Sequence, residues 1–90
     1  MKSKRTRLEI FYDMLRAAQN AGGTIKPTHL LYKSNLSHKK LEEFSKILMD
    51  RELLEVQESG EKRVFVLTDK GLKFLSEYKV IADFTEAFGL

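Results

Sequence analysis

The 90-residue sequence contains no cysteine and only one proline, Pro27. Without cysteine the chain can form neither disulfide bonds nor thiolate metal sites, which indicates a reducing, cytoplasmic environment. No apolar run approaches the roughly 20 residues that a membrane span requires. The first ten residues are basic but lead into no apolar segment, which is unlike a secretory signal. These absences favour a small cytoplasmic protein that does not bind membranes.

The sequence also has little of what catalysis or metal binding requires. The only histidines are His29 and His38, and no cysteine is present to complete a four-ligand zinc site with them. The glycine pair at positions 22 and 23 ends a helix and is not part of a phosphate-binding loop. The adjacent carboxylates Glu42 and Glu43 diverge on a helix. We therefore expect no enzyme activity and no metal or other cofactor, and no small-molecule ligand is evident from the sequence.

Acidic residues are missing from two stretches of the chain. Residues 1–7 hold four bases and no acid, and residues 26–40 hold four lysines, two histidines and no acid. Residues 41–90 carry eleven acids against seven bases, so the net charge is only +3. Clustered lysine and arginine steer and hold phosphates, so this distribution indicates a polyanionic partner. A solvated charge pattern without a partner is the alternative interpretation.

Apolar spacing and helix-end signals predict the order helix, short strand, helix, helix, hairpin, helix. Pro27 suits the first turn of a helix, and Ser37 and Thr68 are good N-caps. The predicted helices cover about residues 5–20, 27–33, 38–51 and 69 onward, and the predicted strands cover 24–26, 54–58 and 63–67. The apolar anchors expected to pack the helices are Leu8, Phe11, Leu41, Phe44 and Leu48.

This order predicts a mostly helical α+β fold, the winged helix-turn-helix. It has a three-helix core, a two-stranded wing and an extended C-terminal helix. The length allows one domain. We divide the chain into a basic N-terminal arm (1–6), the winged domain (7–79) and a C-terminal helix extension (80–90) that could form a dimer contact.

Two motifs resemble those of the small archaeal winged-helix proteins described as predicted transcriptional regulators, which include the Sulfolobus ten-a DNA-binding proteins. The first motif, at the turn, comprises Thr28, Leu30, Leu31, Tyr32, Asn35, Leu36 and Ser37. The second, at the junction of wing and last helix, comprises Leu67, Thr68 and Gly71. The resemblance covers about residues 6–80. It implies double-stranded DNA as partner and a homodimer, because the resembling family dimerises through a longer C-terminal coiled coil.

The predicted third helix would enter the major groove by its first turn, since recognition helices usually meet base edges there. The expected DNA contacts lie on the turn, the wing and the arm: Lys33, Asn35, Ser37, His38, Lys39, Lys40, Lys62, Arg63, Arg5 and Arg7. Lys2 and Lys4 would belong to the same arm, although a frayed, solvated terminus is the alternative. Glu42 and Glu43 are interpreted as pairing with Lys39 or Lys46 rather than accepting from cytosine.

The predicted last helix carries more apolar residues than its own domain needs. An exposed apolar band usually marks an interface, so we expect a dimer contact at Tyr78, Ile81, Phe84 and Phe88. The predicted function is a dimeric DNA-binding regulator or chromatin-associated protein in the nucleoid. The alternative is a winged-helix module that binds protein through this band and does not bind DNA directly, because one fold supports both uses.

Overall fold

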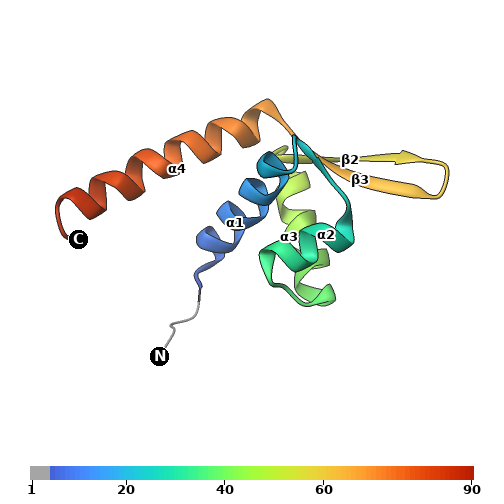
Figure 1. Ribbon diagram of the computed structural model, residues 1–90, viewed down its shortest axis with the longest axis horizontal. Coiled ribbons are helices and arrows are strands. Elements are labelled where there is room, and N and C mark those ends of the chain that lie inside the picture. Colours follow the sequence, from blue (N-terminus) through green and yellow to red (C-terminus); the bar gives the residue numbers. More distant parts are fainter. Residues whose placement is uncertain (1–4) are drawn as a thin grey trace.

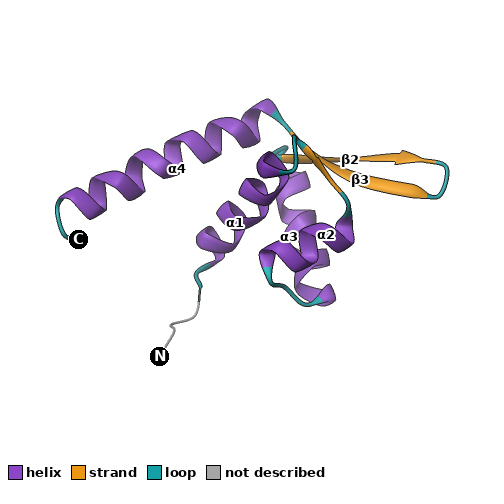
Figure 2. Ribbon diagram, viewed as in Figure 1, coloured by secondary structure: helices purple, strands orange, loops and turns teal. Residues whose placement is uncertain are grey.

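In the computed structural model, which describes residues 5–90, three packed helices carry a projecting hairpin and a projecting fourth helix (Figure 1). Residues 5–90 form α1 (Arg7–Asn20), β1 (Thr24–Ile25), α2 (Pro27–Ser34), α3 (His38–Asp50), β2 (Leu54–Ser59), β3 (Lys62–Leu67) and α4 (Asp69–Ala87). The hairpin and α4 extend in opposite directions from the helical body (Figure 2). The fold is the predicted winged helix-turn-helix.

The sheet has three antiparallel strands in the order β1-β3-β2. The hairpin β2–β3 is the predicted wing, and its turn is shorter than predicted because the pairing continues out to Ser59 and Lys62. The predicted short strand is β1, which forms one edge of the sheet and pairs with β3, with Ile25 opposite Phe65. Both of these side chains are buried, so the sheet joins the wing to the helical core.

Local side-chain hydrogen bonds begin three of the helices. The Thr6 hydroxyl accepts from the Glu9 N–H while the Glu9 carboxylate accepts from the Thr6 N–H, which is a complete capping box. Ser37 accepts from the backbone N–H of Lys40 and so caps α3, as predicted. Thr68 caps α4 by accepting from the backbone N–H of Gly71 at 2.9 Å. Each cap satisfies a backbone N–H that has no partner within the helix, and so stabilises the helix start.

The core lies where α1, α2, α3 and the sheet meet. Its buried apolar side chains are Met14, Leu15, Ala18, Ile25, Leu30, Leu31, Leu41, Phe44, Leu48, Leu54, Phe65 and Leu75. The predicted anchors Leu41, Phe44 and Leu48 are confirmed, and Phe11 packs against Phe44 with ring centroids 5.5 Å apart. The prediction for Leu8 was wrong, because this side chain is 52% exposed.

Leu8 is exposed because no side chain from α3 or α4 fills the space beside the first turn of α1. An open pocket lies there instead, lined by Leu8 together with the last turn of α3 and the start of α4. Met14, which lies beside the predicted apolar stripe, is fully buried. Helix α1 is covered by α2, α4 and β3, so its buried arc is wider than a single stripe predicts.

Gly71 sets how closely α4 approaches the domain. It is buried in the first turn of α4, and a Cβ atom at this position would lie 2.5 Å from the carbonyl oxygen of Leu53. It would also lie 2.6 Å from the Cδ1 atom of Leu67. Such contacts are far inside van der Waals range, so only glycine allows this packing of α4 against the end of the wing.

Candidate nucleic-acid interface

The turn between α2 and α3 directs its leucines inward and most of its polar residues to solvent, but Tyr32 is 74% exposed and Ser34 is fully buried. Helix α2 ends at Asn35, which adopts a left-handed backbone conformation with φ 54° and ψ 54°. Asparagine tolerates this region better than most residues. Leu30 and Leu31 are buried and Leu36 packs against the core, as predicted. The exposed residues of the turn region are Lys33, Asn35, Ser37, His38, Lys39 and Lys40.

The first turn of α3 carries no acid and presents its bases to solvent. His38 and Lys39 are exposed and make none of the ion pairs found among residues 5–90. The Lys40 ammonium lies 5.4 Å from the centre of the Phe44 ring. The backbone N–H groups at this helix start add a partial positive charge that favours anions. The tip of α3 is therefore electropositive and accessible.

The acids of α3 pair differently from the prediction. Glu43 lies 3.6 Å from the ammonium of Lys40, whereas pairing with Lys39 or Lys46 was expected. Lys39 (i,i+4) and Lys40 (i,i+3) are both at a spacing that allows pairing with Glu43, and Glu43 pairs with Lys40. Both partners are at least half exposed, so this pair is worth only a few tenths of a kcal/mol. The prediction was wrong about the partner, and its consequence is that Lys39 keeps its charge unpaired.

A basic groove joins the start of α1 to the first turn of α3. Its volume is about 450 Å³, and its lining brings together Arg5, Arg7 and Lys40 over an apolar floor. All three were predicted DNA contacts, although Lys40 lies more than thirty residues from Arg5 and Arg7 in sequence. No acid lines this groove. The grouping places positive charge beside the tip of α3, where a phosphate backbone could lie.

Arg5 also has a structural task that the sequence did not reveal. Its guanidinium donates to the Asp13 carboxylate at 2.8 Å and to the backbone carbonyl oxygen of Asn35 at 3.1 Å. It therefore ties the turn before α3 to the body of α1. The structure thus gives Arg5 partners within its own chain. Lys2 and Lys4, the other predicted bases of the arm, lie outside the described residues.

The wing places Lys62 and Arg63 beside acids. Arg63 lies opposite Glu58 across the hairpin, and its guanidinium is 5.5 Å from the centre of the Phe65 ring. A groove of about 300 Å³ separates this strand from α3 and is lined by charges of both signs, including Glu42 and Lys46. The sequence alone does not show that Lys46 lies beside the wing, because only the tertiary fold brings the middle of α3 next to it.

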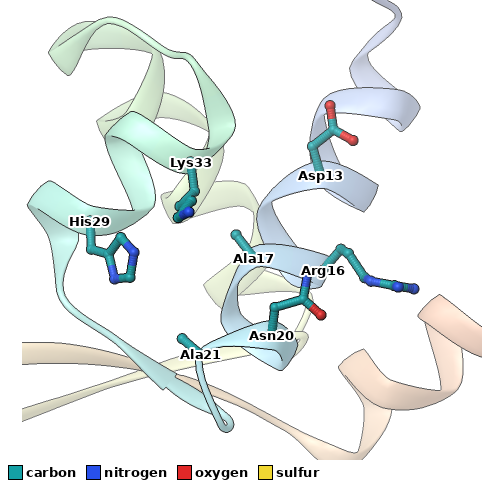
Figure 3. Close-up of a pocket in the computed structure, with 7 residues that line it drawn as sticks. All are labelled: Asp13, Arg16, Ala17, Asn20, Ala21, His29 and Lys33. Carbon is teal, nitrogen blue, oxygen red and sulfur yellow. The ribbon is translucent and has the colours of Figure 1, made fainter.

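A second basic surface lies between α1 and α2. Figure 3 shows His29 and Lys33 on α2, across a pocket of about 400 Å³ from Ala17 and Asn20 on α1. Asp13 also lines this pocket, but its carboxylate is already paired with the guanidinium of Arg5. The small alanine side chains of α1 create the space, and Lys33 is the only predicted DNA contact that lines it.

The predicted dimer residues divide into two groups. Tyr78 stacks on Tyr12 of the same chain, with ring centroids 4.3 Å apart. Burial, together with the nearby carboxylates of Glu9 and Asp13, raises the pKa of the Tyr78 phenol. The other three residues, Ile81, Phe84 and Phe88, are each more than half exposed and touch no core element. Helix α4 therefore uses its first half within the domain and leaves the apolar side chains of its second half in solvent.

Residues 5–90 contain neither a candidate metal cluster nor a candidate membrane span. No cluster of three or more metal-ligating side chains occurs in this part of the chain. Among the same residues, no helix combines the length and the apolar character that crossing a membrane requires.

The three-helix core, the turn before α3 and the hairpin after it define a winged helix-turn-helix protein. The family model for winged helix-turn-helix matches residues 4–86, and the chain belongs to this family. A comparison with curated protein sequences finds no match.

Solved structures of known winged-helix proteins superpose on this chain. Sso10a-2, a DNA-binding protein from Sulfolobus solfataricus, is 17% identical with a TM-score of 0.82, covering 93% of this chain and 85% of that chain. The winged-helix DNA-binding protein F93 from STIV is 23% identical with a TM-score of 0.73, covering 91% and 92%. A MarR family transcriptional regulator from Silicibacter pomeroyi is 28% identical with a TM-score of 0.73, and the alignment covers 92% of this chain but 58% of the regulator.

Proposed function

We propose that this protein binds double-stranded DNA and acts as a transcriptional regulator or chromatin-associated protein. The observation that carries the proposal is the tip of α3, where His38, Lys39 and Lys40 are exposed and no acid lies within the first turn. The winged-helix family and the DNA-binding proteins with the same fold support it. Such a protein would act in the cytoplasm, at the nucleoid.

The distribution of charge along α3 favours entry into the major groove by the tip of the helix. Lys39 has no acid partner, whereas Glu42 and Glu43 follow within a turn and would repel phosphates if the whole helix lay in the groove. The basic groove formed by Arg5, Arg7 and Lys40 would then face one phosphate strand. Phosphate contacts of this kind position the protein, and base contacts specify sequence.

The test replaces Lys39 and Lys40 together by alanine and measures duplex binding by gel shift at several salt concentrations. Each lost phosphate contact should reduce the slope of log affinity against log salt by about 0.9. We therefore expect weaker binding and a slope smaller by about 1–2.

Lys46→Ala is the matched control for entry by the tip, because Lys46 is exposed on the same helix two turns further on. It should change affinity less than the double substitution at the tip. Lys73→Ala on α4 controls for the loss of charge alone. If the double substitution leaves affinity and slope unchanged, the proposed DNA interface is wrong.

We further propose that the exposed half of α4 forms a homodimer contact through Ile81, Phe84 and Phe88, with Tyr78 at its edge. The support is the exposure of these side chains, since contiguous apolar surface of this kind is typical of interfaces. Sedimentation at tens of micromolar should give a dimer, and Phe84→Ala with Phe88→Ala should give a monomer. A monomeric wild type that binds no duplex would favour the other candidate, a module that binds a different protein through this surface.

A further inference from the structure

The open pocket beside Leu8 combines apolar walls with cationic side chains. It lies where the start of α1, the end of α3 and the start of α4 meet, and its volume is about 600 Å³. Its walls are apolar and include Leu8, Phe11 and Ile47. Ligand sites are typically cavities of about 300–1,000 Å³ with apolar walls and a few polar groups. We call this space the α1–α3–α4 pocket.

Three cations surround these apolar walls. Arg7, Arg51 and Lys70 line the pocket, and none of the residues that line it is acidic. Arg7 and Arg51 take part in none of the ion pairs formed among residues 5–90. Lys70 has a distant partner, Glu52 at 3.9 Å, and both side chains are well exposed. The electrostatic potential of the pocket is therefore positive over an apolar floor.

We propose that the α1–α3–α4 pocket binds a small organic acid, a molecule with an apolar body and one carboxylate. The apolar body would cover Leu8, whose side chain is left half in water by the fold. The carboxylate would accept hydrogen bonds from Arg51 and Arg7, because a guanidinium matches a carboxylate with two parallel donors. Charge complementarity selects an acid over a neutral or basic molecule of the same shape.

Arg7 connects this pocket to the basic groove, because it lines both. Its guanidinium lies 5.6 Å from the centre of the Phe11 ring, between the two cavities. A bound carboxylate that holds Arg7 on the α1–α3–α4 side removes one cation from the groove beside the tip of α3. Binding of the acid should therefore weaken binding of duplex. This effect on DNA rests on the proposed function, whereas binding of the acid does not.

The experiment titrates 1-naphthoate and its uncharged counterpart 1-naphthamide into the protein without DNA and follows backbone amide shifts by NMR. Saturable shifts at Leu8, Ile47 and Lys70 are expected with the acid, and binding of the amide should be about tenfold weaker. Arg51→Gln should weaken binding of the acid about tenfold and leave binding of the amide unchanged. Leu8→Gln should weaken binding of both, and Lys46→Gln, outside the pocket, is the matched control.

Three outcomes would overturn the proposal. The first is the absence of a saturable shift at the pocket with naphthoate, and the second is equal binding of the acid and the amide. The third is conversion of a dimer to a monomer by Leu8→Gln without any ligand, which would make the pocket an interface between copies. Loss of duplex binding alone would not affect this result, because the titration contains no DNA. If acid binding is found but does not weaken duplex binding, the connection through Arg7 is wrong.

Discussion

The two halves of α4 are similar in composition and opposite in environment. The first half buries Gly71 and Leu75 and packs Phe74 and Tyr78 against the domain, whereas Ile81, Phe84 and Phe88 of the second half lie in solvent. Both halves are helical, so the formation of the helix does not require burial along its whole length. A short isolated helix is marginal in water. The difference therefore indicates that the first half anchors α4 and the second half is available to a partner.

Truncation of one large aliphatic residue in each half of α4 should give the largest difference in the free energy of unfolding. Leu75 is 5% exposed and Ile81 is 64% exposed. Leu75→Ala should lower the free energy of unfolding by about 2–5 kcal/mol, because it leaves a cavity. Ile81→Ala should change it by no more than about 0.5 kcal/mol at low protein concentration. Denaturant unfolding measures both, and similar losses from the two variants would contradict the comparison.

Denaturant unfolding at high protein concentration tests whether the second half of α4 binds a second copy. A dimer is stabilised by mass action, so its apparent stability rises with concentration. If the second half of α4 binds a second copy, wild type should gain stability with concentration and Ile81→Ala should gain less.

Gly71→Ala tests how closely the first half of α4 packs against the domain. Alanine would normally stabilise a helix interior by about 0.5–1 kcal/mol relative to glycine. Here the added Cβ would meet the Leu53 carbonyl oxygen at 2.5 Å. We expect a net loss of about 1–3 kcal/mol, the usual cost of overpacking. Ser76→Ala, at an exposed position in the same helix, is the control, and a gain in stability from Gly71→Ala would show that α4 can shift freely.

The cap of α4 should matter more than the cap of α3. Thr68 accepts from the Gly71 N–H and also donates to the carbonyl oxygen of Glu52 at 2.7 Å, whereas Ser37 makes the single cap bond. Thr68→Ala should cost about 1–2 kcal/mol and Ser37→Ala about 0.5–1 kcal/mol in thermal or denaturant unfolding. Thr68→Ser should recover most of the loss, since it keeps the hydroxyl. Equal costs for the two alanine variants would show that the second bond of Thr68 contributes nothing.

The smallest expected effect is a pH dependence at the boundary between the halves. Burial and the carboxylates of Glu9 and Asp13 raise the pKa of Tyr78 above its ordinary value of 10.0. The folded state therefore holds this proton more tightly than the unfolded state, and the contribution to stability is lost as pH rises above 10.0. Tyr78→Phe keeps the ring and removes the proton. The stability of wild type relative to this variant should fall above that pH, and parallel pH profiles would contradict the assignment.

Most elements could be predicted because their signals are local. The glycine pair after α1, the proline at the start of α2 and the hydroxyl caps Ser37 and Thr68 each act through the backbone within a few residues. The inward side of the turn was also predicted, since Leu30, Leu31 and Leu36 are the apolar residues of this basic stretch and all three pack in or against the core. The basic tip of α3 could also be predicted, because an absence of acids can be read directly from the sequence.

The rest depends on distances in space that the sequence does not contain. The apolar stripe of α1 does not show that Leu8 is half exposed while Met14 is fully buried, because both depend on which other elements cover this helix. The pairing of β1 with β3 joins residues about forty positions apart, which no local pattern indicates. The contact of Arg5 with the Asn35 carbonyl likewise crosses thirty residues of chain.

The contact made by Arg5 has a practical consequence for any shortened form of this protein. A chain that begins at Arg7 would contain every helix and strand and would fit the predicted domain boundary. It would nevertheless lack the side chain that holds the Asn35 carbonyl to Asp13. The position of the turn before α3 is thus partly set by a residue that precedes all regular structure. An affinity tag or truncation at this end should be designed to spare it.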